Sequence, residues 1–180
     1  MILAKNDLIK HIEAGEIVIE PFDKSIIREN GVDLRIGDEA AVLMNNPEPL
    51  DPENLDRMDL TQYYKIVKVD KELVLQPYMK ILVTTLEYIK VPTFIAGLVE
   101  LRSTFARLGL SIPPTIIDAG FEGQITLEVH GGAFPVILRK GLKFAHIVFI
   151  KLTTETEPYR GKYFRQKASH YRDNSNEVPF

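Results

Sequence analysis

The stretch "GQITLEVHGG", residues 123–132, alternates apolar and polar residues and ends in two glycines. Alternation with a period of two predicts a half-buried β-strand, and the glycines predict a turn after it. The strand would turn its apolar side chains to the core and present four polar ones on the other face: Gln124, Thr126, Glu128 and His130. Polar faces of antiparallel sheets commonly meet solvent. The pattern alone therefore favours a wet strand over a chemical role for Glu128.

Short alternating segments of the same kind recur along most of the chain. They cover residues 16–21, 32–37, 63–69, 72–77, 81–91, 95–101, 124–129, 134–139 and 143–152. One amphipathic helix is predicted at about residues 5–14, with Asn6 or Asp7 as its cap and Gly15 at its end. The segment 45–56 is rich in proline and acid and predicts a surface loop. These patterns predict an all-β barrel or sandwich with small helical additions.

Composition indicates one ordinary globular domain of 180 residues, 45% apolar and 26% charged. The net charge of -3 provides no basic field, so nucleic acid is not an expected partner. The absence of cysteine excludes disulfides, thiolate nucleophiles and cysteine-ligated zinc. Asp7 and Glu13 come too early for a signal peptide, and no apolar run is long enough to span a bilayer. A cytoplasmic protein without a membrane partner is the default expectation.

The segment "RSTFARLG", residues 102–109, interrupts the strand pattern. Ser103 can cap a single helical turn over residues 104–108, which Gly109 would end. Free backbone N–H groups at a helix start, beside Arg102 and Arg107, suit a phosphate group. Without further information, a connecting turn with two solvated arginines is the simpler interpretation.

Several motifs in order along the chain resemble one enzyme family. They are "NDLIKHIEAGEIVIEP", "RENGVDLRIG", "RSTFAR", "IIDAGFEG", "ITLE" and "PYRGKYFRQ". Together they cover most of the sequence and are similar to the dCTP deaminases, a branch of the trimeric dUTPase-like nucleotide enzymes. The wordings "PPTIIDAGFEG" and "GKY" resemble the archaeal branch.

The resemblance implies a distorted, dUTPase-like β-barrel that works as a homotrimer with active sites at subunit interfaces. Residues 1–158 would form the barrel domain, and residues 159–180 a flexible segment that closes over nucleotide. The implied reaction is hydrolytic deamination of dCTP to dUTP and ammonia, with Mg²⁺ bound through the triphosphate, no protein metal ligand and no zinc. dTTP is the implied inhibitor. A cysteine-free chain also cannot supply the ligands of the zinc deaminases.

The family's general base is the glutamate of the "LE" strand, which falls here on Glu128. A carboxylate can take a proton from water during attack on C4, protonate N3, and help ammonia leave. The resemblance places Arg107 beside Glu128, where a charge-assisted hydrogen bond would keep the carboxylate ionised. Ser103 would position the water or the amino group.

The resemblance implies a larger set of residues that bind the nucleotide. The phosphates would meet Arg102, Ser103, Thr104 and Arg107, some of them across a subunit boundary. Asp118 would contact the deoxyribose 3′-hydroxyl or hold a hydrolytic water, although a turn aspartate before Gly120 has a plain structural explanation. The remaining substrate-binding residues are Thr126, Tyr159, Lys162 and Gln166.

Three alternatives stay open. The chain could act as a dUTP diphosphatase with Asp118 as the water-activating carboxylate, although it lacks that family's glycine-rich C-terminal arm. A bifunctional enzyme that makes dUMP from dCTP would retain the same carboxylates. A non-catalytic nucleotide-binding trimer would need the phosphate-binding residues but no base at Glu128. The bacterial His-x-Thr-Ala stretch is replaced here by "SIPPTIID", so Pro114 and Thr115 receive no catalytic role.

Two histidines and a tyrosine pair have structural interpretations. His146 is expected to be a satisfied, partly buried side chain, and Tyr63 and Tyr64 are expected to pack within a strand. His130 lies two residues from Glu128 on one face, close enough to influence it, but the family pattern assigns it no role.

Overall fold

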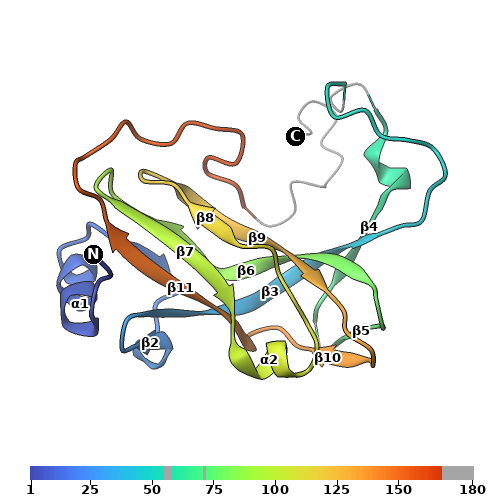
Figure 1. Cartoon of the computed structure of the whole chain (residues 1–180), viewed down its shortest axis with the longest axis horizontal. Coiled ribbons are helices and arrows are strands. Elements are labelled where there is room, and N and C mark those ends of the chain that lie inside the picture. The colour runs from blue at the N-terminus through green and yellow to red at the C-terminus, as the bar shows by residue number, and fades with distance from the viewer. Residues whose placement is uncertain (55–57, 71, 168–180) are drawn as a thin grey trace.

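The computed structural model describes residues 1–54, 58–70 and 72–167, and strands dominate them (Figure 1). In chain order the elements are α1 (Lys5–Glu13), β1 (Val18–Glu20), the 3-10 helix η1 (Lys24–Ile26), β2 (Ile27–Arg28), β3 (Gly31–Leu43), the 3-10 helix η3 (Leu60–Gln62), β4 (Tyr64–Lys68), β5 (Leu73–Leu75), β6 (Lys80–Lys90), β7 (Ile95–Leu101), α2 (Ser103–Arg107), β8 (Thr115–Ile117), β9 (Glu122–His130), β10 (Val136–Leu138) and β11 (Lys143–Lys151). The all-β prediction with small helical additions is confirmed.

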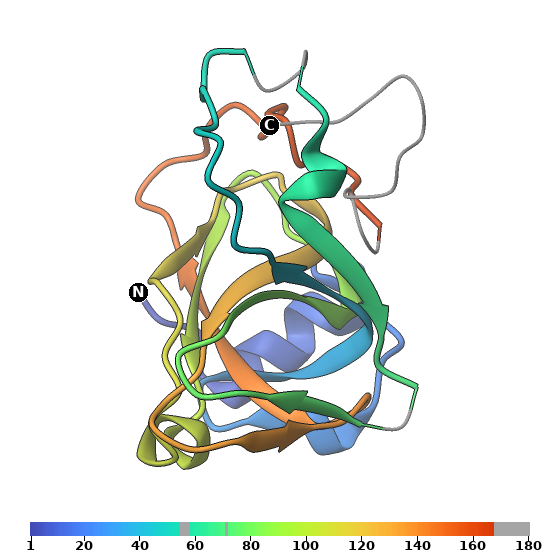
Figure 2. The ribbon, with the colours of Figure 1, turned by 90° about the vertical axis from the view of Figure 1, so that its right-hand side faces the viewer.

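One nine-stranded antiparallel sheet carries most of these elements. Its main path runs β1-β6-β3-β11-β7-β8, with β2 and β4 paired to β3 and β9 paired to β6. Strands β10 and β5 form a separate two-stranded ribbon. Two perpendicular views show that the sheet curls around its core, which gives the molecule the form of a half-barrel (Figure 1, Figure 2).

The register of β9 decides which side chains face the core. Ile125, Leu127 and Val129 are buried to 2%, 1% and 1% exposure, and the residues between them are only half-buried. Burial of each such aliphatic side chain stabilises the fold by about 1.5–3 kcal/mol. The alternation predicted for this strand is confirmed, and Glu128 points away from the core.

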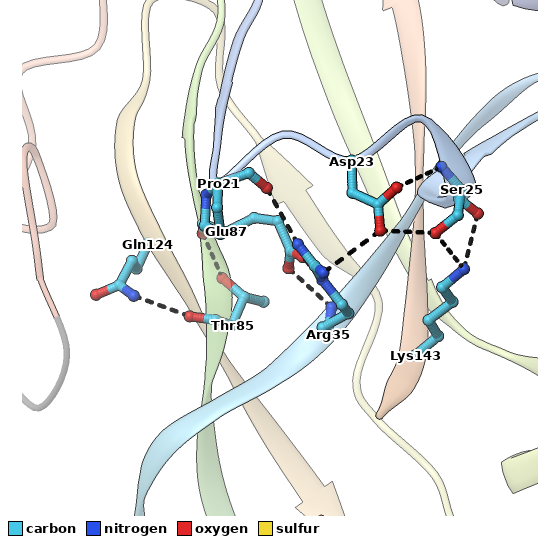
Figure 3. A network of polar contacts seen from close by, with 8 residues as sticks. All are labelled: Pro21, Asp23, Ser25, Arg35, Thr85, Glu87, Gln124 and Lys143. Atoms are coloured by element: carbon cyan, nitrogen blue, oxygen red, sulfur yellow. Dashed lines mark hydrogen bonds and ion pairs between the residues drawn. The ribbon is translucent and has the colours of Figure 1, made fainter. Parts of the chain in front are cut away.

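A buried polar network holds β9 against its neighbour where the β6–β9 register shifts between Thr84 and Tyr88 (Figure 3). The Thr85 hydroxyl accepts a hydrogen bond from the Ile125 N–H at 3.0 Å and donates to the Glu87 carbonyl at 2.9 Å. The Glu87 carboxylate is fully buried and accepts hydrogen bonds from the backbone and the guanidinium of Arg35. Because the charge is paired, it can be buried here, and the shift in β6 leaves the alternation of β9 intact.

The strand boundaries differ from the predicted ones at β3 and β8. Strand β3 continues to Leu43, beyond the predicted residues 32–37, and most of its residues are buried, so that burial does not alternate along it. A strand covered on both sides has no alternation to detect. Strand β8 has three residues, too few for a periodic signal.

The N-terminal caps of both α-helices were predicted wrongly. Helix α1 begins after Ala4, which offers no side-chain hydrogen bond, and the free N–H of Lys5 is satisfied by the Glu29 carbonyl at 2.8 Å. A tertiary contact thus replaces the expected Asn6 or Asp7 cap. In α2 the N-cap is Arg102, so Ser103 lies inside the helix. The predicted ends at Gly15 and Gly109 are confirmed by their φ values of +70° and +83°.

Two predicted segments fall partly outside the described residues. In the loop 45–56, residues 45–54 belong to no helix or strand, and residues 55 and 56 lie outside the description. Of the segment 159–180, only residues 159–167 are described. For His146 the structural prediction is confirmed, because its Nδ1 lies 3.1 Å from Asp33 Oδ1 and the side chain is 21% exposed.

Candidate functional site

A cavity of about 490 Å³ lies on the polar face of β9, opposite the core. It is enclosed by β8, by the turn that follows β8, by β9 and by the C-terminal segment. Its lining residues are Leu82, Pro113, Thr115, Ile116, Ile117, Asp118, Phe121, Ile125, Thr126, Glu128, Tyr159, Tyr163 and Gln166. A cavity of this size and mixed lining suits a small organic ligand.

Glu128 is the carboxylate that β9 contributes to this cavity. Its register partner on β6 is Leu82, which lines the cavity on the same face. The Glu128 side chain is 37% exposed, so it is accessible to a ligand and to water. Its Oε1 lies 2.7 Å from Nε2 of His130, the next side chain on that face. A base that is partly exposed and fixed by one hydrogen bond can act on a bound water.

Tyr64 of β4 also belongs to the surroundings of Glu128. Burial of the phenol raises the pKa of Tyr64, and the nearby Glu128 carboxylate and Tyr163 raise it further. Tyr64 therefore remains protonated at neutral pH. The packing predicted for the tyrosine pair did not anticipate this neighbour.

Asp118 enters the cavity from the turn that follows β8. The Phe121 N–H donates to the Asp118 carbonyl at 3.1 Å, which closes the turn, and Gly120 within it has a φ of +78°. A Cβ atom at Gly120 would lie 2.6 Å from Cα of Pro158, so glycine also makes room for the C-terminal segment. The turn therefore places a second carboxylate in the cavity that Glu128 lines, and it receives the C-terminal segment.

The C-terminal segment lies against the free edge of β9. The Arg165 N–H donates to the Glu122 carbonyl at 2.6 Å, and the Gln124 N–H donates to the Gln166 carbonyl at 2.9 Å. At the other end of the strand, Ser111 bridges to His130. The cavity opens between these two contacts, beside Thr126 and Glu128.

Aromatic packing adds to this seating of the segment. The rings of Tyr159 and Phe121 lie 5.9 Å apart, and the Tyr159 hydroxyl accepts a hydrogen bond from the Tyr163 N–H at 3.2 Å. Gln166 is buried, and its side-chain amide donates to the Gln124 carbonyl. Residues 159–167 thus form one wall of the cavity.

A second polar contact ties this wall to β9. The Tyr88 hydroxyl donates to Glu122 Oε1 at 2.8 Å, and Arg165 Nε lies 3.4 Å from the same oxygen. The Tyr88 hydrogen bond and the charge of Arg165 lower the pKa of Glu122. Burial and the contact with Glu122 raise the pKa of Tyr88 to about 12. Glu122 is therefore an ionised anchor for Arg165 at neutral pH.

Helix α2 carries the remaining predicted residues on an exposed turn at the end of β7 (Figure 1). Ser103, Thr104 and Arg107 are exposed and do not line the cavity. Arg102 turns inward: its Nε lies 3.6 Å from the buried Asp33, and its Nη1 donates to the Lys143 carbonyl at 3.2 Å.

The fold thus brings together half of the predicted site. Asp118, Thr126, Glu128, Tyr159 and Gln166 share the cavity, whereas Arg102, Ser103, Thr104, Arg107 and Lys162 are not among its lining residues. Within the described chain the ion-pair partner of Glu128 is His130 and not Arg107. Sequence reasoning did not identify Tyr64, Phe121 or Tyr163 as neighbours, because only contacts between distant segments place them there.

Two further observations concern metal-ligand clusters and membrane-spanning helices. Within the ranges that the structure describes, no three His, Cys, Asp or Glu side chains gather where they could hold a metal ion. None of the helices in the described parts of the chain is long and apolar enough to cross a membrane.

Comparison with known proteins agrees with the fold and with the sequence motifs. A family profile described as dCTP deaminase-like matches residues 2–152. The dCTP deaminase of Sulfurisphaera tokodaii is 49% identical over 168 residues, which cover 93% of this chain and 89% of that protein. A protein of Sulfolobus islandicus rod-shaped virus 1, named "Probable deoxyuridine 5'-triphosphate nucleotidohydrolase", is 43% identical over 168 residues, with coverage of 93% and 95%.

Among solved structures, the 2'-deoxycytidine 5'-triphosphate deaminase from Agrobacterium tumefaciens has the same fold, with a TM-score of 0.65 at 21% identity. The match covers 82% of this chain and 47% of that chain, so the chain spans about half the length of that protein. The profile match and the identity to the archaeal protein extend over nearly the whole sequence. The chain therefore belongs to the dCTP deaminase-like family.

Proposed function

We propose that the protein is a dCTP deaminase that releases dUTP and ammonia. The observation that carries the proposal is the Glu128 carboxylate, which a regular strand presents to a cavity of about 490 Å³. The relatives at high identity named dCTP deaminase support the choice of substrate.

In the proposed reaction Glu128 acts as general base and then as general acid. Its carboxylate takes a proton from water while the water oxygen attacks C4 of the cytosine ring. The proton passes to N3, which gives a tetrahedral C4 that bears hydroxyl and amino groups. Glu128 then moves the hydroxyl proton to the amino group, the C4–N bond breaks, and ammonia leaves as the uracil carbonyl forms. The cysteine-free chain offers no zinc-deaminase ligand set for activating this water.

Substrate binding is assigned to the residues around the same cavity. Asp118 would bind the deoxyribose 3′-hydroxyl, because it lines the same cavity as Glu128. Thr126, Tyr159 and Gln166 would contact the nucleotide from β9 and from the C-terminal segment. Lys162 is half-buried within this segment and would reach a phosphate when the segment closes fully. Residues 159–180 would act together as this closing segment.

A homotrimer would supply what one chain lacks. We assign Ser103 and Arg107 as catalytic residues and Arg102 and Thr104 as phosphate ligands, delivered to the cavity by α2 of a neighbouring subunit. The support is that α2 is exposed and lies outside the cavity, while Ile116 of the cavity wall is 69% exposed in the single chain.

Mg²⁺ would enter the site with the triphosphate. The described residues offer no carboxylate or histidine cluster able to hold the ion by themselves, which fits coordination mainly by phosphate oxygens. When bound, the ion would neutralise phosphate charge during binding. We further propose a cytoplasmic enzyme that acts on free nucleotide, with dTTP as a competing ligand and with no nucleic-acid or membrane partner.

A second candidate function is hydrolysis of dUTP, alone or after deamination, to give dUMP. Asp118 favours it, because a second carboxylate in the same cavity could activate water at the α-phosphate. The name of the viral relative points to the same reaction. A non-catalytic nucleotide-binding trimer would show neither reaction.

Product analysis separates these functions. Purified protein is incubated with Mg²⁺ and either dCTP or dUTP, and the nucleotides are resolved by chromatography. We expect dUTP from dCTP and no change in dUTP. Conversion of either substrate to dUMP identifies the diphosphatase activity, and Asp118→Asn should then abolish it. The absence of any product overturns both enzymatic proposals.

A further inference from the structure

His130 makes the one side-chain hydrogen bond that the structure gives to Glu128 among the described residues. Nε2 of His130 lies 2.7 Å from Oε1 of Glu128, and the two side chains are 34% and 37% exposed. They stand two residues apart on the polar face of β9, where neighbouring side chains point the same way. The contact occupies one carboxylate oxygen, so Oε2 is the oxygen left for a bound water.

Hydrogen bonds and strand pairing fix the backbone of His130 on both edges of β9. The N–H of His130 donates to the Ser111 carbonyl at 2.9 Å, and its carbonyl accepts from the Ser111 N–H at 3.2 Å. On the other edge His130 is in register with Lys80 of β6. The next residue, Gly131, donates its N–H to the Met79 carbonyl at 2.8 Å. A histidine whose backbone is fixed in this way can restrict the movement of the Glu128 carboxylate.

We propose that His130 is a positioning residue that orients Glu128 for proton transfer. The inference rests on the proposed deamination and deepens it. With its proton on Nε2, the imidazole donates to Oε1 and limits the rotation of the carboxylate. After Oε2 has taken the proton from water, Oε1 is a carbonyl oxygen and still accepts the same hydrogen bond. One contact therefore serves both the base and the acid stage of the reaction.

The contact also predicts a dependence on pH. Histidine is the side chain that ordinarily changes charge between about pH 5 and 8. A charged imidazolium would hold the carboxylate as an ion pair and weaken it as a base. The other titratable groups around this pair are Asp118 of the turn after β8, Tyr64 of β4, Tyr163 of the C-terminal segment and Lys80 of β6. Tyr64 stays uncharged at neutral pH because burial and Glu128 raise its pKa.

The test compares two substitutions of His130. In His130→Leu the donor is lost at similar size, and in His130→Gln a side-chain amide can replace the Nε2 donor. Ammonia release from dCTP is followed over a range of pH, with kcat and KM determined separately and thermal unfolding measured alongside. We expect His130→Leu to lower kcat by about 10- to 100-fold with little change in KM, because the loss falls on the transition state. His130→Gln should recover most of kcat, and its kcat should persist to lower pH than in the wild type.

A matched control is available on α1. His11 Nδ1 lies 2.6 Å from Glu16 Oε2, a histidine–glutamate contact of similar length away from the cavity. His11→Leu should leave kcat and its pH profile unchanged. A purely structural role for His130 would instead lower the melting temperature equally in His130→Leu and His130→Gln, and neither would separate from the other in kcat.

Glu128→Gln separates failure of this inference from failure of the proposed function. If Glu128→Gln is inactive while His130→Leu retains wild-type kcat, the role of His130 is overturned and the deaminase proposal stands. Wild-type turnover in Glu128→Gln, or no ammonia from the wild-type protein, overturns the proposed base and the role of His130 together.

Discussion

Strand β9 presents Glu128 to a cavity that the same chain encloses, whereas α2 carries Ser103 and Arg107 on an exposed turn outside it. The first region has walls from three distant parts of the sequence. In the described chain no cavity wall surrounds α2, although the family motif implies that α2 and β9 serve one reaction. We propose that one subunit forms the cavity and that α2 of a neighbouring subunit completes it.

The largest effect is expected for Glu128→Gln. Removal of the general base should reduce ammonia release from dCTP by about 10³-fold. Nucleotide binding, measured by calorimetry, should change little because the amide keeps the shape of the side chain. Glu100→Gln is the matched control, since Glu100 is an exposed carboxylate on strand β7 and is not among the cavity-lining residues. Retained turnover in Glu128→Gln would show that the reaction does not occur in this cavity.

The next prediction tests whether α2 acts on a neighbour. Ser103→Ala and Arg107→Ala should each lower kcat by about 10²-fold or more if they serve the transition state. Ser103→Ala and Glu128→Gln chains, each inactive alone, are unfolded together and reassembled. Random assembly of a trimer joins an intact Glu128 with an intact neighbouring Ser103 in about a quarter of the sites, so about a quarter of the wild-type rate should return.

Failure of the mixture to recover activity, with trimers confirmed by light scattering, would mean that each chain supplies both residues to its own site. Helix α2 would then have to move toward its own β9, and the division between the two regions would be wrong.

A smaller effect is expected from removing the wall that covers the cavity. A chain that ends at Pro158 loses the Tyr159–Phe121 packing and the seating of Gln166 on β9. In a Glu128→Gln background, its affinity for dCTP should fall by about tenfold because a polar contact and an aromatic surface are lost. The melting temperature should fall by only a few degrees, since the core of β9 is unchanged. A chain that ends at Lys167 is the matched comparison. If the chain that ends at Pro158 binds dCTP as tightly as the chain that ends at Lys167, the segment has no closing role.

The smallest effect concerns the contact of Arg165 with Glu122. The pKa of Glu122 lies below its ordinary value of 4.5, so its contribution is fully present above that pH and is lost as pH falls through the lowered value. Hydrogen exchange of the Arg165 amide should therefore accelerate a few-fold in that acidic window, relative to the amide of Leu127 in the core. Glu122→Gln removes the titrating charge, so in this variant the ratio of the Arg165 to the Leu127 exchange rate should no longer show that acceleration. If the ratio of the Arg165 to the Leu127 exchange rate depends on pH equally in the wild type and in Glu122→Gln, Glu122 is not the anchor.

Local pattern was sufficient for the strand that matters most. The alternation of β9 predicted the burial of Leu127 and the outward placement of Glu128, because side chains in a strand change face at every residue. The helix at residues 5–14 and the all-β class followed from the same kind of reasoning. The buried strand β3 and the three-residue β8 were incompletely predicted, since neither has a periodic signal.

By itself, the sequence determined which residues of β9 face the core, which motifs are present and in what order, and hence the family expected for the chain. Only the tertiary structure placed Asp118 and Gln166 in one cavity with Glu128, joined His130 to Glu128, and left α2 outside. The physical reason is the range of the forces involved. Periodicity follows from backbone geometry within a few residues, whereas a cavity wall requires segments far apart in the sequence to pack against one another.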